Sequence, residues 1–291
     1  MPVSISVYLN QADYFYLAPA PDTFMTETKS IPVVMTFAGN DPTGGAGIQA
    51  DIETLASIGC HAAPVITANT IQDTHDVIDY EPVDTGLLIA QARAVLEDMP
   101  VAAFKIGLIG SVANVEAIHT LLKDYPDRPV VLDPVLSSNA GSELSDEAIR
   151  DAMVTLLLPL TKVVTPNSVE ARILAPEGDT LDACAQQLLS LECEYVLITG
   201  THENTPEVIN TLYANQQRLE SFRWERLPGS YHGSGCTLSS AIAGLLAQGI
   251  DPFNAVHEAQ EYTWESLKHG YRPGMGQLIP DRLYWSRRDD E

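Results

Sequence analysis

Short apolar runs alternate with amphipathic stretches along most of the chain. The runs fit buried strands, which the pattern places at residues 33–37, 62–68, 102–106, 130–133, 162–165 and 195–198. Apolar residues at helical spacing predict helices at residues 48–58, 87–96, 112–122, 145–159, 169–174, 181–191, 236–247 and 254–268. Continuous apolar strands that alternate with helices are typical of a parallel sheet with helices on both faces. The sequence therefore predicts an α/β fold with a mostly parallel central sheet.

Two regions depart from this alternation. Residues 209–213 and 219–224 predict a β pair joined across residues 215–217. Core-like patterning begins only at Ile31, so we expect residues 1–30 to be an appendage, with Met25 as an alternative start, and residues 31–291 to be a single domain. The first thirty residues have neither a positively charged segment nor a continuous apolar run, and they predict neither a secretory signal nor a membrane span.

The loops that follow the strands are the natural place for a ligand. In open parallel sheets the ligand crevice lies beyond the carboxyl ends of the strands. We therefore expect one shared rim to form from residues 39–47, 69–76, 107–111, 133–141, 166–170, 200–204 and 229–236.

The last of these loops predicts an anion site. Gly233-Ser234-Gly235 precedes a strong helix former that begins near Cys236. The free N–H groups at a helix start attract anions, phosphates above all, and glycines let the backbone approach closely. The alternative is an ordinary helix start.

Two common nucleotide motifs are absent. The dinucleotide fingerprint G-x-G-x-x-G fails because Leu238 stands where the third glycine belongs, and neither glycine-rich loop contains the lysine of a Walker loop. The sequence thus excludes a Rossmann dehydrogenase and a P-loop nucleoside triphosphatase.

Composition narrows the range of partners. Hydrophobic residues make up 45% of the chain, which indicates a globular protein. The net charge of −23 repels nucleic acid and anionic membranes, so we expect neither as a partner. The cysteines, at positions 60, 184, 193 and 236, show no paired spacing, which favours reduced thiols and a cytoplasmic location.

Several blocks together resemble a known family. They are residues 38–51, 65–74, 105–110, 131–135, 165–170 and 232–241. In these blocks, and in their order, the sequence resembles the hydroxymethylpyrimidine/phosphomethylpyrimidine kinases of thiamine biosynthesis, within the ribokinase-like superfamily. The resemblance implies a ribokinase-like fold, ATP with Mg²⁺, and usually a homodimer. It also implies phosphorylation of 4-amino-5-hydroxymethyl-2-methylpyrimidine and then of its monophosphate. One departure is Thr199-Gly-Thr-His202, where the family often has Lys-Gly-Gly-His.

The resemblance assigns the catalytic loop to Gly233, Ser234, Gly235 and Cys236. At a helix start the pKa of a thiol falls below its free value of about 8.5, so we expect Cys236 to form a thiolate near neutral pH. It would accept the proton of the substrate hydroxyl, while the backbone donors contribute the larger share of the rate. The alternative is a small core cysteine.

Further residues match positions beside the two substrates. Substrate-binding candidates are Gln72, Gly39, Asp51 and Leu108; ATP-binding candidates are Asn167, Thr199 and Thr237; metal candidates are Glu170 and Asp133. The carboxamide of Gln72 complements an aminopyrimidine edge. Asp51 is equally well explained as a helix carboxylate paired to backbone, and Glu170 as a carboxylate favoured by the helix dipole.

Two other functions remain open at this point. A pyridoxal kinase would carry out the same reaction on a different hydroxymethyl heterocycle. A non-catalytic pyrimidine-binding regulator would have no need of groups for the γ-phosphate and Mg²⁺.

Overall fold

The computed structural model describes residues 30–137 and 144–286. Residues Ile31–Glu291 belong to one compact unit by their contacts. Apart from Ser30, the appendage predicted at residues 1–30 lies outside the described residues, and so do residues 138–143 and 287–291.

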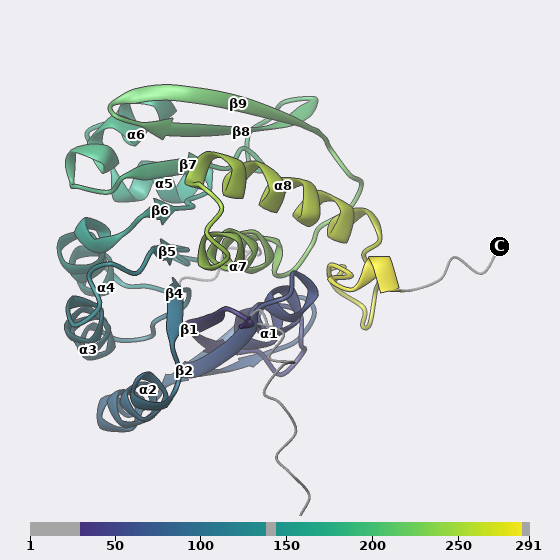
Figure 1. The fold of residues 1–291 in the computed structure, drawn as a ribbon. Coiled ribbons are helices and arrows are strands. Elements are labelled where there is room, and N and C mark those ends of the chain that lie inside the picture. Colours follow the sequence, from purple (N-terminus) through teal and green to yellow (C-terminus); the bar gives the residue numbers. More distant parts are fainter. Residues whose placement is uncertain (1–29, 138–143, 287–291) are drawn as a thin grey trace, which may run out of the picture. The chain divides into compact units, whose positions relative to one another are not determined.

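Nine strands of the described chain form one sheet in the order β3-β2-β1-β4-β5-β6-β7-β8-β9 (Figure 1). Their bounds are β1 (Val33–Asn40), β2 (His61–Gln72), β3 (Val77–Pro82), β4 (Val101–Ile106), β5 (Val130–Leu132), β6 (Val163–Val164), β7 (Tyr195–Ile198), β8 (Glu207–Ala214) and β9 (Gln217–Glu225). Strands β2, β1, β4, β5, β6 and β7 run parallel, whereas β3, β8 and β9 pair in the antiparallel sense. The predicted α/β fold with a mostly parallel sheet is confirmed.

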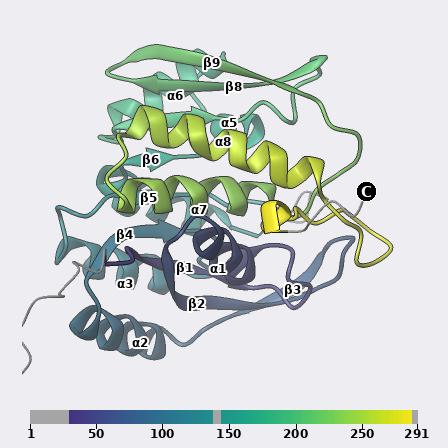
Figure 2. The same cartoon turned by 45° about the vertical axis from the view of Figure 1, so that its right-hand side comes forward.

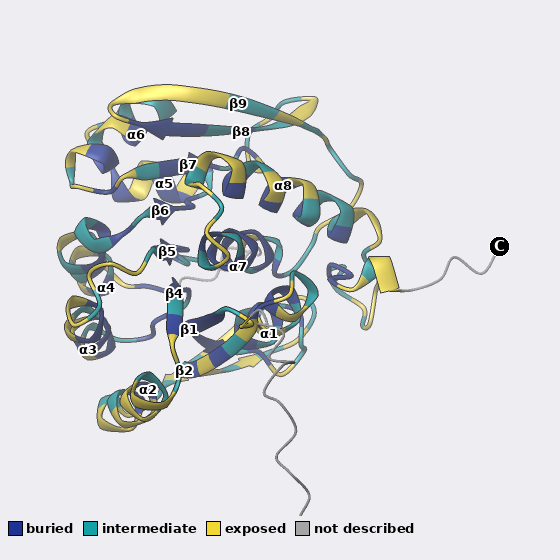
Figure 3. Ribbon diagram, viewed as in Figure 1, coloured by how far each residue is buried: buried dark blue, intermediate teal, exposed yellow. Residues whose placement is uncertain are grey.

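Helices cover both faces of this sheet (Figures 1 and 2). One face carries α1 (Gly47–Ser57), α7 (Ser234–Ala247) and α8 (Pro252–Lys268); the other carries α2 (Thr85–Asp98), α3 (Val112–Lys123), α4 (Glu147–Ala152), α5 (Ser168–Leu174) and α6 (Leu181–Ser190). A hydrophobic cluster fills each side. In β1 the side chain of Val34 joins one cluster and those of Met35 and Phe37 join the other, which explains why the central strands are continuously apolar. Figure 3 shows the central strands buried and the outward helix faces exposed.

The structure differs from the sequence prediction at one edge of the sheet. Strand β2 extends to Gln72 and pairs with β3, where we predicted a polar loop over residues 69–76 and no strand after it. Strand β3 has no buried residue, so it lacks the continuous apolar run that marks the central strands.

A second difference concerns the helix predicted at residues 145–159. Helix α4 ends at Ala152 and is followed by a π turn over Met153–Leu157 and a 3₁₀ turn over Leu158–Leu160. Within residues 30–137 and 144–286, no helix combines the length and apolar character needed to span a bilayer.

Candidate active site

A cavity of about 790 Å³ lies beyond the carboxyl ends of the parallel strands. Each of the seven loops expected to share a rim contributes to its wall, through Gly39, Gln72, Leu108, Asp133, Asn167, Thr201 and Ser234. That expectation is confirmed for the described residues, while residues 138–141 lie outside them.

The N-terminus of α7 forms one wall of this cavity. The helix begins at Ser234, two positions before the expected start at Cys236, and its N-cap is Gly233 with φ of 81°. No side chain caps the helix. The first N–H groups of a helix have no partner within it, so the amides of residues 234–236 form a set of donors beside the cavity.

The loop between β1 and α1, residues 39–47, packs directly against this helix start. A β carbon at Gly233 would lie 1.9 Å from the carbonyl oxygen of Gly45, and one at Gly45 would lie 2.4 Å from Cδ2 of His232. Position 233 therefore requires glycine, because the clash there is with a backbone atom and φ is positive, whereas a side chain at position 45 would force the His232 ring to move. The two loops come from distant parts of the sequence, and their backbones approach closely at Gly45 and Gly233.

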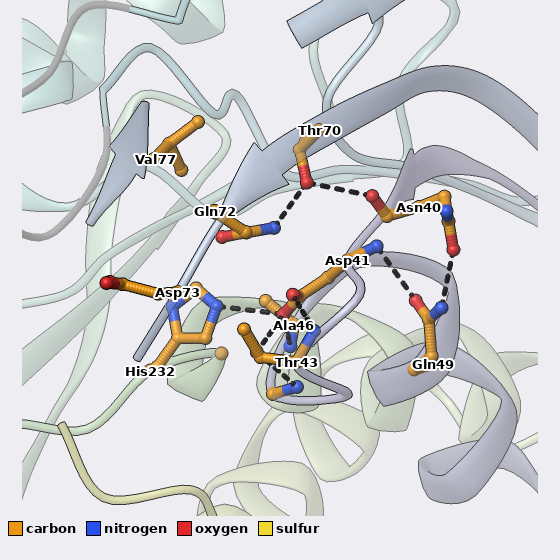
Figure 4. Close-up of polar contacts among 12 residues, drawn as sticks. Asn40, Asp41, Thr43, Ala46, Gln49, Thr70, Gln72, Asp73, Val77 and His232 are labelled. Atoms are coloured by element: carbon orange, nitrogen blue, oxygen red, sulfur yellow. Dashed lines mark hydrogen bonds and ion pairs between the residues drawn. The ribbon is translucent and has the colours of Figure 1, made fainter. Parts of the chain in front are cut away.

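Asp41 holds the first loop in shape and links it to the second (Figure 4). Its buried carboxylate accepts hydrogen bonds from the backbone N–H groups of Thr43 (2.8 Å) and Ala46 (2.7 Å). It also lies 2.9 Å from Nε2 of His232. Burial raises the pKa of Asp41, but the bonds from His232 and Thr43 outweigh it and hold the pKa below its ordinary value.

Gln72 lies at the end of β2, next to this loop on the cavity wall (Figure 4). Its Nε2 donates a 2.6 Å hydrogen bond to Oγ1 of Thr70, which in turn donates to the carbonyl of Asn40. Its Oε1 is buried and has no hydrogen-bond partner among the described residues. A buried acceptor without a partner costs free energy, so this oxygen is a candidate contact for a ligand.

Gly39 and Leu108 lie on the same wall. A β carbon at Gly39 would come within 2.9 Å of Cδ2 of Leu108, so these two residues are in direct contact. Both line the cavity, as Gln72 does.

The structure places Asp51 away from the cavity wall. Its carboxylate is fully buried, 2.8 Å from Nζ of Lys105, and it accepts a 2.6 Å hydrogen bond from Ser240. It is therefore paired to side chains. Burial alone would lower the pKa of Lys105, but Asp51, Cys236 and Asp133 together hold it above its ordinary value.

Cys236, in the first turn of α7, lies within hydrogen-bonding reach of Asp133. Oδ2 of Asp133 accepts a 3.2 Å hydrogen bond from Ser239, and both residues line the cavity. Burial raises the pKa of the Cys236 thiol to about 12; Lys105 partly opposes the shift, and Asp133 and Asp51 add to it. The expected thiolate at neutral pH is therefore wrong for the ligand-free protein, because burial and two carboxylates outweigh the helix N-terminus.

Asn167 and Glu170 form a capping box at the start of α5. Oδ1 of Asn167 accepts from the N–H groups of Val169 (2.9 Å) and Glu170 (3.0 Å), while Oε2 of Glu170 accepts from the N–H of Asn167 (2.9 Å). Oε1 of Glu170 accepts a 3.3 Å bond from the N–H of Leu136. The carboxylate thus fulfils the structural role that we considered, and it still lines the cavity.

The donor set fits a hydrated divalent cation. Burial, and then the charge of Asp133, raise the pKa of Glu170 to about 8, and burial also raises the pKa of Asp133. A cation nearby would stabilise the charged form of both buried carboxylates. In the described chain no group of three or more His, Cys, Asp or Glu side chains could hold a metal. A site with two carboxylates suits Mg²⁺, which keeps several waters and binds substrate phosphates.

The two threonines expected near ATP have different positions. Thr199 follows β7, bridges to Asn167 and lines the cavity. Thr237 is buried behind the wall, where its hydroxyl donates to the carbonyl of Gly233 (2.9 Å) and accepts from Nε of Arg282 (2.9 Å).

Three residues that shape the site did not stand out in the sequence. Asp41 precedes a proline in a turn-rich loop, where an aspartate is common, and His232 is a lone histidine with no pattern around it. Arg226 donates to the carbonyls of Thr201 (2.8 Å) and Glu203 (2.9 Å), and so holds the loop in which the family's lysine is missing. Their partners are distant in sequence or are backbone atoms, and neither leaves a local pattern.

The chain is similar in sequence to proteins of one known family. The sequence pattern described as phosphomethylpyrimidine kinase matches residues 41–281. The hydroxymethylpyrimidine/phosphomethylpyrimidine kinase of Rhizobium meliloti is 36% identical over 252 residues, which cover 84% of this chain and 94% of that protein.

Two crystal structures are similar in both fold and sequence. The phosphomethylpyrimidine kinase of Clostridium difficile superposes with a TM-score of 0.71 at 33% identity, covering 82% of this chain and 100% of that one. An ADP complex of Bacillus subtilis pyridoxal kinase superposes with a TM-score of 0.80 at 28% identity, covering 88% and 99%. The resemblance seen in the sequence is thus confirmed, and the chain, a ribokinase-like kinase, belongs to the phosphomethylpyrimidine kinase family.

Proposed function

We propose that this protein transfers the γ-phosphoryl group of ATP to the hydroxymethyl group of 4-amino-5-hydroxymethyl-2-methylpyrimidine. It then transfers a second phosphoryl group to the resulting monophosphate. The relative from Rhizobium meliloti bears the name of this activity. The observation that carries the proposal for this chain is the buried, unpartnered Oε1 of Gln72, a residue that lines the same cavity as the N-terminus of α7.

Gln72 recognises the pyrimidine in this proposal. Its Oε1 and its second Nε2 hydrogen match an exocyclic amine beside a ring nitrogen, and Thr70 fixes the plane of the carboxamide. Leu108 and Val77 line the same cavity and supply apolar surface for the ring. Gly39 lets Leu108 pack directly against the backbone of this wall.

The amides of residues 234–236 hold the transferred phosphoryl group. They lie at the positive end of α7, where a negatively charged group is stabilised. Phosphoryl transfer has a loose transition state, so positioning and charge stabilisation supply most of the rate. These amides therefore contribute more than any proton acceptor.

Cys236 accepts the proton of the hydroxyl group in the first transfer. With a pKa raised to about 12 in the ligand-free protein, only a small fraction of the thiol is ionised at neutral pH, which limits this contribution. The nucleophile of the second transfer is a phosphate oxygen, which needs no proton acceptor.

Asp133 and Glu170 would hold Mg²⁺, at least partly through water. When bound, the ion neutralises charge on the phosphates of ATP. The described residues that line the cavity include Arg226 but no lysine, so few side-chain cations face the phosphates. Asn167 and Thr199 contact ATP from the wall, and Thr237 acts through the carbonyl of Gly233. The proposal includes a homodimer and a cytoplasmic location, which rest on the family resemblance and the cysteine content.

The pyridoxal kinase of Bacillus subtilis is close in structure, so pyridoxal is the second candidate substrate. A coupled assay of ADP formation should test the pyrimidine alcohol, its monophosphate and pyridoxal. We expect Mg²⁺-dependent turnover of the first two, a higher kcat/KM for the pyrimidine alcohol than for pyridoxal, and loss of activity with EDTA. Faster turnover of pyridoxal would contradict the proposal. Pyrimidine binding without any turnover would instead indicate a regulator.

Replacing Gln72 should separate the two substrates. In Gln72→Leu the ligand's donor and acceptor lose their partners, so the KM of the pyrimidine should rise about 10- to 100-fold while the KM of ATP stays near the wild-type value. Gln217→Leu, at an exposed position in β9, is the matched control and should behave as wild type. An equal rise in both KM values would argue against a role in reading the pyrimidine.

Replacing Cys236 should separate the two transfers. A proton acceptor with a pKa of about 12 gains ionised fraction as the pH rises, so the rate of the first transfer should increase about tenfold per unit between roughly pH 7 and 9. In Cys236→Ala this dependence should vanish and the first transfer should slow much more than the second.

Initial rates of both transfers across this pH range provide the measurement. Cys193→Ala is the control, because burial also raises the pKa of Cys193 to about 12 and this residue is outside the cavity wall. Equal losses of the two transfers in Cys236→Ala would rule out the proton-acceptor role.

A further inference from the structure

The C-terminal segment places a buried arginine beneath the two glycine-rich loops. Arg282 lies beyond α8, and its side chain is fully buried. Burial of a guanidinium costs free energy unless its N–H donors have partners, so the contacts of Arg282 indicate its structural role.

Each part of this guanidinium contacts a different element. Nε donates a 2.9 Å hydrogen bond to Oγ1 of Thr237 in α7, and Nη2 donates to the carbonyl of Gly45 in the β1–α1 loop. Nη1 lies 3.0 Å from Oε2 of Glu53 in α1, a carboxylate that is 45% exposed. One rigid planar group therefore spans both walls of the cavity from behind.

Two of these contacts end at the close packing between the loops. The hydroxyl of Thr237 in turn donates a 2.9 Å hydrogen bond to the carbonyl of Gly233. The carbonyl of Gly45 is the atom against which the α carbon of Gly233 packs. Asp41 and His232 link the same two loops on the cavity side. Arg282 links them on the buried side, and we call this second link the tie.

We propose that Arg282 is a positioning residue that sets the distance between residues 39–47 and residues 229–236. The inference rests on the proposed function, in which the first loop lies beside the pyrimidine and the second beside the γ-phosphate. When the guanidinium of Arg282 is removed, each loop can still bind its own substrate. Misalignment should then slow the chemical step and leave the binding of each substrate nearly unchanged.

The kinetic test compares Arg282→Met with wild type well below the unfolding temperature of both. We expect kcat to fall about 10- to 100-fold for both transfers, because a displacement of about 1 Å has this effect, while each KM stays within about threefold. Arg282→Lys keeps a charge and donors but loses the planar fork, so it should recover part of kcat at unchanged KM. Should Arg282→Met not fold, a fall in kcat at unchanged KM in Arg282→Lys decides the same question.

Tyr262→Phe is the matched control. The hydroxyl of Tyr262 donates a 2.8 Å hydrogen bond to the backbone carbonyl of Arg282, so its loss loosens the same segment and leaves the guanidinium contacts in place. Its kcat should match wild type. A loss in Tyr262→Phe equal to that in Arg282→Met, a rise in KM at constant kcat, or an unchanged kcat in Arg282→Met would overturn the proposal.

Hydrogen exchange without substrate separates this proposal from the proposed function. Arg282→Met should increase amide exchange in residues 39–47 and 229–236 and leave the β8–β9 hairpin unchanged. If wild type fails to phosphorylate the pyrimidine, the proposed function falls and this exchange pattern still decides whether Arg282 ties the loops. Equal exchange in mutant and wild type would refute the tie.

Discussion

The close packing of Gly45 against Gly233 is the contact on which the candidate site depends. A β carbon at position 233 would lie 1.9 Å from the Gly45 carbonyl oxygen, so the loop after β1 lies directly against the start of α7. The Asp41–His232 pair and Arg282 reinforce this packing from opposite sides. Chain segments nearly two hundred residues apart thereby form one continuous wall.

Charge is the second constraint. The chain carries a net charge of −23, and the cavity wall includes the carboxylates of Asp133 and Glu170. These carboxylates would repel a nucleoside triphosphate unless the cavity wall also supplied positive charge. The uncapped start of α7 supplies part of it, and the two carboxylates suit a divalent cation that would supply more. In the proposed function, backbone dipoles and a divalent cation would take the place of the lysine that the family often has in the loop after β7.

The sequence predicted the central strands, most of the helices and the shared rim. Burial on both faces leaves continuous apolar runs in the strands, and burial on one face leaves apolar residues at helical spacing, so neither needs tertiary information. It missed β3, whose residues are half-buried or exposed. It also misjudged the thiol of Cys236, since the local helix start was visible and the carboxylates of Asp133 and Asp51 were not. The roles of His232 and Arg282 arise from partners that are distant in sequence, and a single sequence does not indicate such contacts.

The most direct test is a crystal structure with AMP-PCP, Mg²⁺ and the pyrimidine alcohol. The account predicts that oxygens of the terminal phosphate lie within about 3.2 Å of the backbone nitrogens of residues 234–236, with the hydroxymethyl oxygen facing that phosphate. A terminal phosphate bound elsewhere in the cavity, out of reach of these nitrogens, would contradict it.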